Sequence, residues 1–84
     1  MATVIDEIIR VGAVFGGTRK LKPVWFIWKE YQYRVKTVTY CWVSKQGAAA
    51  VYHFSVSDQA DNLYELQYNT KSMVWILYQA EYGG

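Results

Sequence analysis

Residues 51–69, VYHFSVSDQADNLYELQYN, decide the fold class of this chain. In residues 52–57 the apolar side chains occupy every second position, and the same alternation returns in residues 64–69. Polar residues 58–62 separate the two runs. A period of two is typical of a β-strand with one face buried, and a short polar break between two such runs is typical of an antiparallel connection. The segment therefore predicts two neighbouring antiparallel strands.

The same kind of pattern extends to both ends of the chain. Glycine or polar segments separate the runs at roughly ten-residue spacing, which is typical of an antiparallel meander or a small barrel. No stretch of ten residues has a convincing helical pattern. The sequence predicts an all-β fold with six strands, in a meander, a strongly curled sheet or a small barrel: residues 8–15, 24–28, 33–44, 52–57, 64–69 and 74–78.

Two segments leave local alternatives open. Residues 4–12 fit a strand, but Ile5, Ile8 and Ile9 also fit one face of a helix. Gly12 and the many β-branched residues favour the strand. The apolar phase of residues 33–44 switches in the middle, which predicts a β-bulge or a sharp bend near Thr37.

Length and composition predict one domain over residues 1–84, with a core at about residues 8–78 and flexible termini. A chain of 84 residues buries a modest core, so aromatic packing or self-association has to contribute to stability. Aromatic residues form 18% of the chain.

Cys41 is the single cysteine of the chain. No internal disulfide can form, and a lone thiol without a targeting signal predicts a cytoplasmic protein. No apolar run is long enough to span a membrane.

The sequence offers no set of residues for catalysis or metal binding. His53 and Cys41 are each the only residue of their type, and a metal site needs three or four ligands. We interpret His53 as a surface or hydrogen-bonded histidine and Cys41 as a small packed residue. No catalytic triad can be assigned, so we expect a protein that is not an enzyme and that has no cofactor.

Charge is distributed unevenly along the chain. Residues 1–45 contain eight of the nine Lys and Arg residues, whereas residues 46–84 contain four of the seven Asp and Glu residues. Such asymmetry is found in polyanion-binding proteins, although it also fits mutual attraction between the two halves of a sheet.

Basic and aromatic residues are interleaved in the second and third expected strands, a pattern that is typical of single-strand nucleic-acid binders. The candidate nucleic-acid-binding residues are Arg19, Lys20, Lys29, Tyr31, Arg34 and Lys36.

Two expected strands, residues 24–28 and 74–78, are apolar on both faces. An apolar outer face has to be covered by the curl of the sheet or by another chain. The sequence therefore predicts a non-catalytic interaction module that is a homo-oligomer or binds a protein partner, with single-stranded nucleic-acid binding as the alternative. The candidate interface residues are Trp25, Ile27, Val74, Ile76 and Tyr78.

A further set of positions carries a family resemblance: Pro23, Phe26, Trp28, Tyr33, Arg34, Val35, Trp42, Tyr52, Phe54, Val56, Glu65, Leu66, Trp75 and Leu77. Over residues 8–78 this pattern resembles a small uncharacterised bacterial family, a domain of unknown function that occurs alone or appended to DNA-polymerase-like repair proteins. The resemblance implies an all-β fold, and the association with polymerases favours nucleic-acid binding. It supplies no active-site residues.

Overall fold

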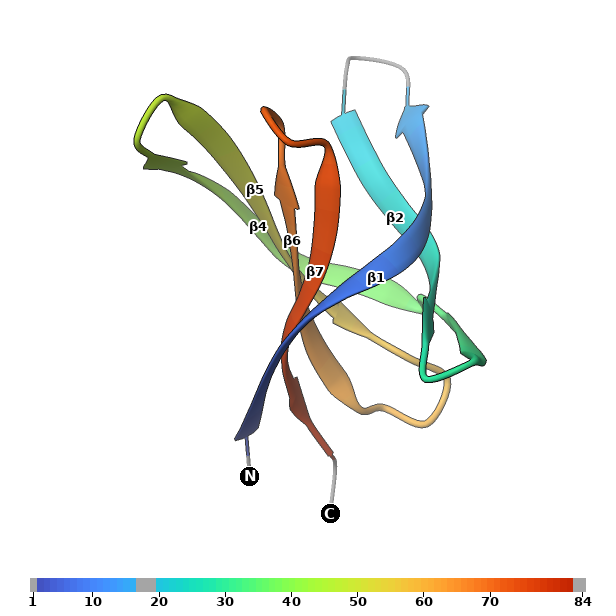
Figure 1. Cartoon of the computed structure of the whole chain (residues 1–84). Coiled ribbons are helices and arrows are strands. Elements are labelled where there is room, and N and C mark those ends of the chain that lie inside the picture. Colours follow the sequence, from blue (N-terminus) through green and yellow to red (C-terminus); the bar gives the residue numbers. More distant parts are fainter. Residues whose placement is uncertain (1, 17–19, 83–84) are drawn as a thin grey trace.

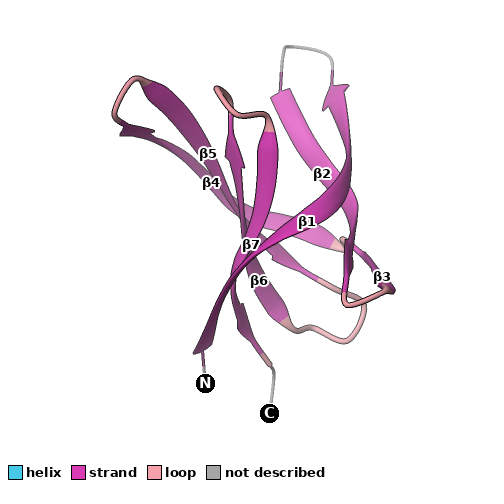
Figure 2. Ribbon diagram, in the orientation of Figure 1, coloured by secondary structure: helices cyan, strands magenta, loops and turns pink. Residues whose placement is uncertain are grey.

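A computed structural model describes residues 2–16 and 20–82, in which the regular elements are all antiparallel strands (Figures 1 and 2). The strands form a single sheet with the order β3-β2-β1-β7-β6-β5-β4. The all-β, antiparallel prediction is confirmed, but the strands number seven rather than six. They are β1 (Ala2–Gly16), β2 (Lys20–Trp28), β3 (Tyr31–Arg34), β4 (Thr37–Gln46), β5 (Ala49–Ser57), β6 (Leu63–Asn69) and β7 (Val74–Glu81).

The extra strand arises because the strand expected over residues 33–44 is divided in two. Its halves, β3 and β4, lie at opposite ends of the strand order. Between them, the Val35 backbone N–H donates to the Val24 carbonyl of β2 (3.0 Å), and the Lys36 N–H donates to the Ser57 carbonyl of β5 (2.7 Å). The sheet therefore curls until its two edges meet at this corner. Because β3 and β4 do not pair with each other, the sheet stays open and is not a closed barrel.

A β-bulge in β4 accounts for the phase switch in the sequence. The register between β4 and β5 shifts between Val38 and Tyr40, so Thr39 is an extra residue on β4. The predicted bulge or bend near Thr37 is confirmed. Val38 packs against the core, whereas Trp42 pairs with His53 on the opposite face. A bulge of one residue has this effect because side chains alternate along a strand.

Residues 4–12 belong to a strand, so the helical alternative is wrong. β1 pairs with β2 on one side and with β7 on the other, and the paired region runs from Ala2 to Glu81, beyond the expected limits of 8 and 78. Ile8 and Ile9, which would share a helix stripe, lie on opposite faces of the sheet. Ile9 is buried in the core, whereas 75% of Ile8 is exposed.

The core lies on the face of the sheet that carries Phe26, Phe54, Leu66 and Leu77, which we call the inner face. Near the corner where the edges meet, the ring of Phe26 stacks on Tyr33 (5.0 Å between centroids) and meets the edge of Tyr64 (5.1 Å). These rings come from β2, β3 and β6, so they close the curl from the inside. Aromatic contacts of this kind add stability beyond the area they bury.

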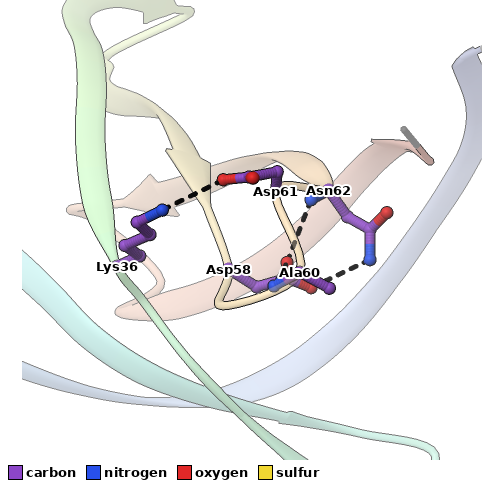
Figure 3. A network of polar contacts seen from close by, with 5 residues as sticks. All are labelled: Lys36, Asp58, Ala60, Asp61 and Asn62. Atoms are coloured by element: carbon purple, nitrogen blue, oxygen red, sulfur yellow. Dashed lines mark hydrogen bonds and ion pairs between the residues drawn. The ribbon is translucent and has the colours of Figure 1, made fainter. Parts of the chain in front are cut away.

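The β5–β6 loop supports the same corner (Figure 3). The buried Asp58 carboxylate accepts hydrogen bonds from the Ala60 N–H (2.8 Å), the Asn62 N–H (2.9 Å), the Asn62 side-chain amide (3.2 Å) and the Tyr64 hydroxyl (2.7 Å). Burial alone would raise the pKa of Asp58, but these hydrogen bonds outweigh it and hold the pKa below its ordinary value. Asp61 in the same loop pairs with the Lys36 ammonium at 3.1 Å.

Candidate interaction surfaces

Four of the five candidate interface residues lie on one surface of the outer face, opposite the core. Trp25 and Ile27 on β2 and Val74 and Ile76 on β7 flank the central strand β1. Ile8 of β1 pairs with Ile76 of β7 and projects from the same face, where it is 75% exposed. We call Ile8, Trp25, Ile27, Val74 and Ile76 the outer patch. Sequence reasoning missed Ile8 because the alternation of residues 8–15 does not reveal which strands adjoin β1.

The fifth candidate interface residue, Tyr78, has a different role. Glu65 pairs with Gln79 and Leu66 pairs with Leu77, so Tyr78 is a bulged residue of β7 without a partner position on β6. It is half-buried. Tyr78 therefore belongs to an irregularity of the sheet rather than to the outer patch.

A shallow depression adjoins the outer patch. Its volume is about 430 Å³, and Ile8, Arg10, Trp25 and Val74 line it together with Met73, which is 73% exposed. The Trp25 indole lies across Gly12 of β1, where a side chain would collide with it. Arg10 lies between Ile8 and Gly12 on the same face of β1, opposite Ile27, so this largely apolar surface contains an arginine.

The candidate nucleic-acid residues do not form one cluster. Lys29 lies in the β2–β3 turn, with its ammonium 5.0 Å from the centre of the Trp28 ring, and Tyr31 is the first residue of β3. Lys36 forms an ion pair with Asp61.

Arg34 is opposite Trp25 in the register of β2 and β3, and so lies at the margin of the outer patch. Lys20 begins β2, at the far end from Lys29, and its side chain, like the whole of Arg19, lies outside the described residues.

The two edges of the sheet differ in how well they are protected against pairing with another strand. β3 is four residues long, and the part of β2 beyond it contains Lys22 and Pro23. Lysine, proline and short length are the usual means by which an edge strand avoids new partners. At the other edge, β4 pairs with β5 alone in the described chain. It is ten residues long, contains no proline, and has Lys45 as its only charged residue.

The side chains of β4 are also largely exposed. Tyr40 is 65% and Val43 is 55% exposed. Cys41 is exposed as well, so its interpretation as a packed residue is wrong. It lies on an edge strand, where one neighbour is missing and little covers a small side chain. We call the unpaired side of Thr37–Gln46 the β4 edge.

A chain of polar side chains crosses the outer face of β4, β5 and β6. Ser44 Oγ lies 2.7 Å from His53 Nε2, and His53 Nδ1 lies 3.3 Å from Glu65 Oε2. The interpretation of His53 as hydrogen-bonded is confirmed. The order Ser–His–Glu matches that of a hydrolase triad. Sequence reasoning missed it because the three residues come from separate strands whose register the sequence does not state.

The surroundings of this polar chain are those of a structural network. The Trp42 indole stacks on the imidazole of His53 at 4.8 Å, and the Gln67 amide donates to the same Glu65 oxygen at 3.0 Å. His53 is 8% exposed. Trp42 and Glu65 line the small depression beside Leu63, but neither Ser44 nor His53 lines it, the depression beside the outer patch, or the one beside β3 and the Asp58 loop. A substrate would need such a cavity next to the nucleophile.

Residues 2–16 and 20–82 hold no group of three His, Cys, Asp or Glu side chains that could bind a metal ion. In the same part of the chain, no helix is long and apolar enough to cross a membrane. No family model matches the chain, and no curated protein or solved structure matches it significantly. The resemblance to the repair-associated family stays a prediction from the sequence.

Proposed function

We propose that this protein is a non-catalytic interaction module that associates with a second copy of itself. The observation that carries the proposal is the contrast between the two sheet edges. One edge consists of the four-residue β3 and the part of β2 that contains Lys22 and Pro23, whereas the β4 edge is ten residues long and has one charged residue. A long edge strand with few charges and no proline is a template for pairing with another chain, and β4 is regular beyond its bulge. The outer patch adds exposed apolar surface of the kind found at interfaces.

A binding role fits the remaining features better than a catalytic one. In the Ser44–His53–Glu65 chain, His53 lies under Trp42, and the small depression that Trp42 and Glu65 line does not include Ser44 or His53. An interaction of this kind needs no cofactor. The exposed thiol of Cys41 supports a reducing compartment, such as the cytoplasm, because exposed free thiols oxidise outside it.

Sedimentation velocity of the full chain in reducing buffer tests this function directly. We expect the sedimentation coefficient to rise with protein concentration from that of a monomer to that of a dimer. A single monomeric species over the whole concentration range would contradict the proposal. Reducing conditions are needed so that oxidation of Cys41 does not mimic association.

Single-stranded nucleic-acid binding is the second candidate function. It is favoured by the position of Arg34, which lies opposite Trp25 on the outer face, with Arg10 on the neighbouring strand opposite Ile27. A base could stack on the indole while the two guanidinium groups bind phosphates. Of the six residues predicted from the sequence, Arg34 is the one that belongs to this group.

A fluorescence titration with a short single-stranded DNA, at low and at physiological salt, tests this second function. Saturable quenching of tryptophan that weakens with salt is expected, because phosphate contacts release counterions. Arg34→Ala should reduce the binding, whereas Lys71→Ala, an exposed lysine in the β6–β7 turn, serves as the control. No change in fluorescence at low salt would exclude this function.

A further inference from the structure

We infer that two copies of the chain associate by antiparallel pairing of their β4 strands about a two-fold axis at Val43. This inference rests on the proposed self-association and names the surface and the register. The alternative surface within the same function is the outer patch, where association would bury Ile8. The two surfaces lie on separate parts of the sheet, so substitutions can distinguish them.

The bulge at Thr39 limits the pairing to one part of β4. The β4–β5 register is regular from Tyr40 to Gln46, whereas it shifts between Val38 and Tyr40. A bulge leaves its residue unpaired and bends the strand, so a new ladder is expected to end there. The β4–β5 hairpin also projects away from the β1–β2 hairpin at the end of the sheet opposite the chain termini (Figure 1). Tyr40–Gln46 is thus the regular segment that a second strand can reach.

Symmetry then restricts the position of the axis. Residues directly opposite each other in an antiparallel pair project from the same face, and side chains alternate between faces along each strand. A two-fold axis perpendicular to the sheet also keeps each face on its own side. A residue and its partner must therefore be an even number of positions apart, so the axis passes through a residue. An axis at Val43, the middle residue of Tyr40–Gln46, pairs the whole of this regular segment with its copy.

This register is compatible with the side chains of the strand. The only charged residue, Lys45, lies opposite an uncharged residue and not opposite the second lysine. Like charges directly opposite each other would destabilise the pair. The exposed Val43 side chain gains an apolar neighbour on the axis. The opposing pairs are Val43 with Val43, Trp42 with Ser44, Cys41 with Lys45, and Tyr40 with Gln46.

Val43→Lys tests the axis, because it places two like charges directly opposite each other. Val14→Lys is the matched control: Val14 is 48% exposed, close to the 55% of Val43, and lies on β1, away from the β4 edge. In sedimentation velocity we expect Val14→Lys to form the dimer as the unchanged protein does and Val43→Lys to remain monomeric at the same concentration. A dimer in Val43→Lys that persists unchanged would overturn the inference.

A disulfide test does not depend on a loss of association. Opposite residues in an antiparallel pair have Cα atoms about 4.5–5.5 Å apart, within the range of about 4.4–6.8 Å that a disulfide needs. In the double variant Cys41→Ser/Val43→Cys, mild oxidation should form a covalent dimer rapidly. The unchanged chain, with Cys41 opposite Lys45, should do so much more slowly. Equal rates, or faster cross-linking through Cys41, would overturn the assigned register.

The same variants separate the failure of this inference from the failure of the proposed function. If association is lost in Ile8→Lys but kept in Val43→Lys, self-association stands and the β4 pairing is wrong. If the unchanged chain is a monomer at every concentration, both are wrong. Circular dichroism of Val43→Lys shows whether this variant retains the sheet. If it does not, the cross-linking of Cys41→Ser/Val43→Cys alone tests the assigned register.

Discussion

The Trp25 indole lies directly over Gly12, its partner in the register of β2 and β1. A Cβ atom at Gly12 would fall among the atoms of the indole ring. The glycine therefore lets the ring lie flat along the outer face, where it forms part of the outer patch. The same arrangement gives the first prediction.

Gly12→Ala should lower the free energy of unfolding by about 1–3 kcal/mol, because the methyl group displaces the Trp25 ring from its packed position. Chemical denaturation measures this loss. In a Trp25→Ala background, the same glycine substitution should cost much less, since the colliding ring is absent. Equal costs in the two backgrounds would show that Trp25 and Gly12 are not coupled.

The two aspartates of the β5–β6 loop should differ in their contribution to stability. Asp58→Asn removes a buried charged acceptor of hydrogen bonds from Tyr64, Asn62 and Ala60, and should cost about 1.5–3 kcal/mol. Asp61→Asn is the control, because it removes an exposed ion pair with Lys36 and should cost no more than about 1 kcal/mol. Asparagine also tolerates the positive φ of residue 61. Equal losses would contradict this assignment.

Asp58 should also contribute to the acid sensitivity of the fold. Its pKa is lower in the folded chain than its ordinary value, so its stabilising contribution is present above the unfolded pKa and is lost as the pH falls through the folded pKa. Stability of the unchanged protein should therefore fall as the pH drops below about 4. In Asp58→Asn this part of the pH dependence should be missing. Denaturant unfolding at several pH values measures the free energy of unfolding of both proteins. If this free energy falls equally with pH in both, Asp58 is not a source of the acid sensitivity.

The Ser44–His53–Glu65 chain should stabilise the sheet without catalysing hydrolysis. Ser44→Ala should lower the free energy of unfolding by about 1 kcal/mol, because it removes the hydrogen-bond partner of His53 Nε2. A fluorophosphonate probe, which labels activated serines, should leave the unchanged protein unmodified. Labelling that disappears in Ser44→Ala would instead identify a nucleophile and contradict the non-catalytic proposal.

Strand periodicity in the sequence predicts most of the fold but cannot predict its connections. The alternation in residues 52–57 and 64–69 corresponds to β5 and β6, and the phase switch near Thr37 corresponds to the bulge at Thr39. The division of residues 33–44 into β3 and β4 could not be predicted, because Val35 and Lys36 continue an extended pattern. Only their hydrogen bonds to Val24 and Ser57, far apart in the chain, show that the strand passes from one sheet edge to the other.

The candidate surfaces were predictable to a similar degree. Two-sided apolar runs indicated the outer patch, although the inclusion of the exposed Ile8 depends on the register of β1 against β7. Exposure of Cys41 and the contact between Ser44 and His53 depend on which strand lies at the edge and on how neighbouring strands align. Neither property is encoded in a local pattern of residues.

Amide hydrogen exchange of dilute and concentrated protein tests the central claim, association through the β4 edge, most directly. Pairing with a second strand gives hydrogen-bond partners to the outward N–H groups of Tyr40–Gln46. We expect protection in this segment to rise with concentration, while protection in β1 and β7 stays the same. Unchanged protection in Tyr40–Gln46, or a rise confined to the outer-patch strands β1 and β7, would contradict it.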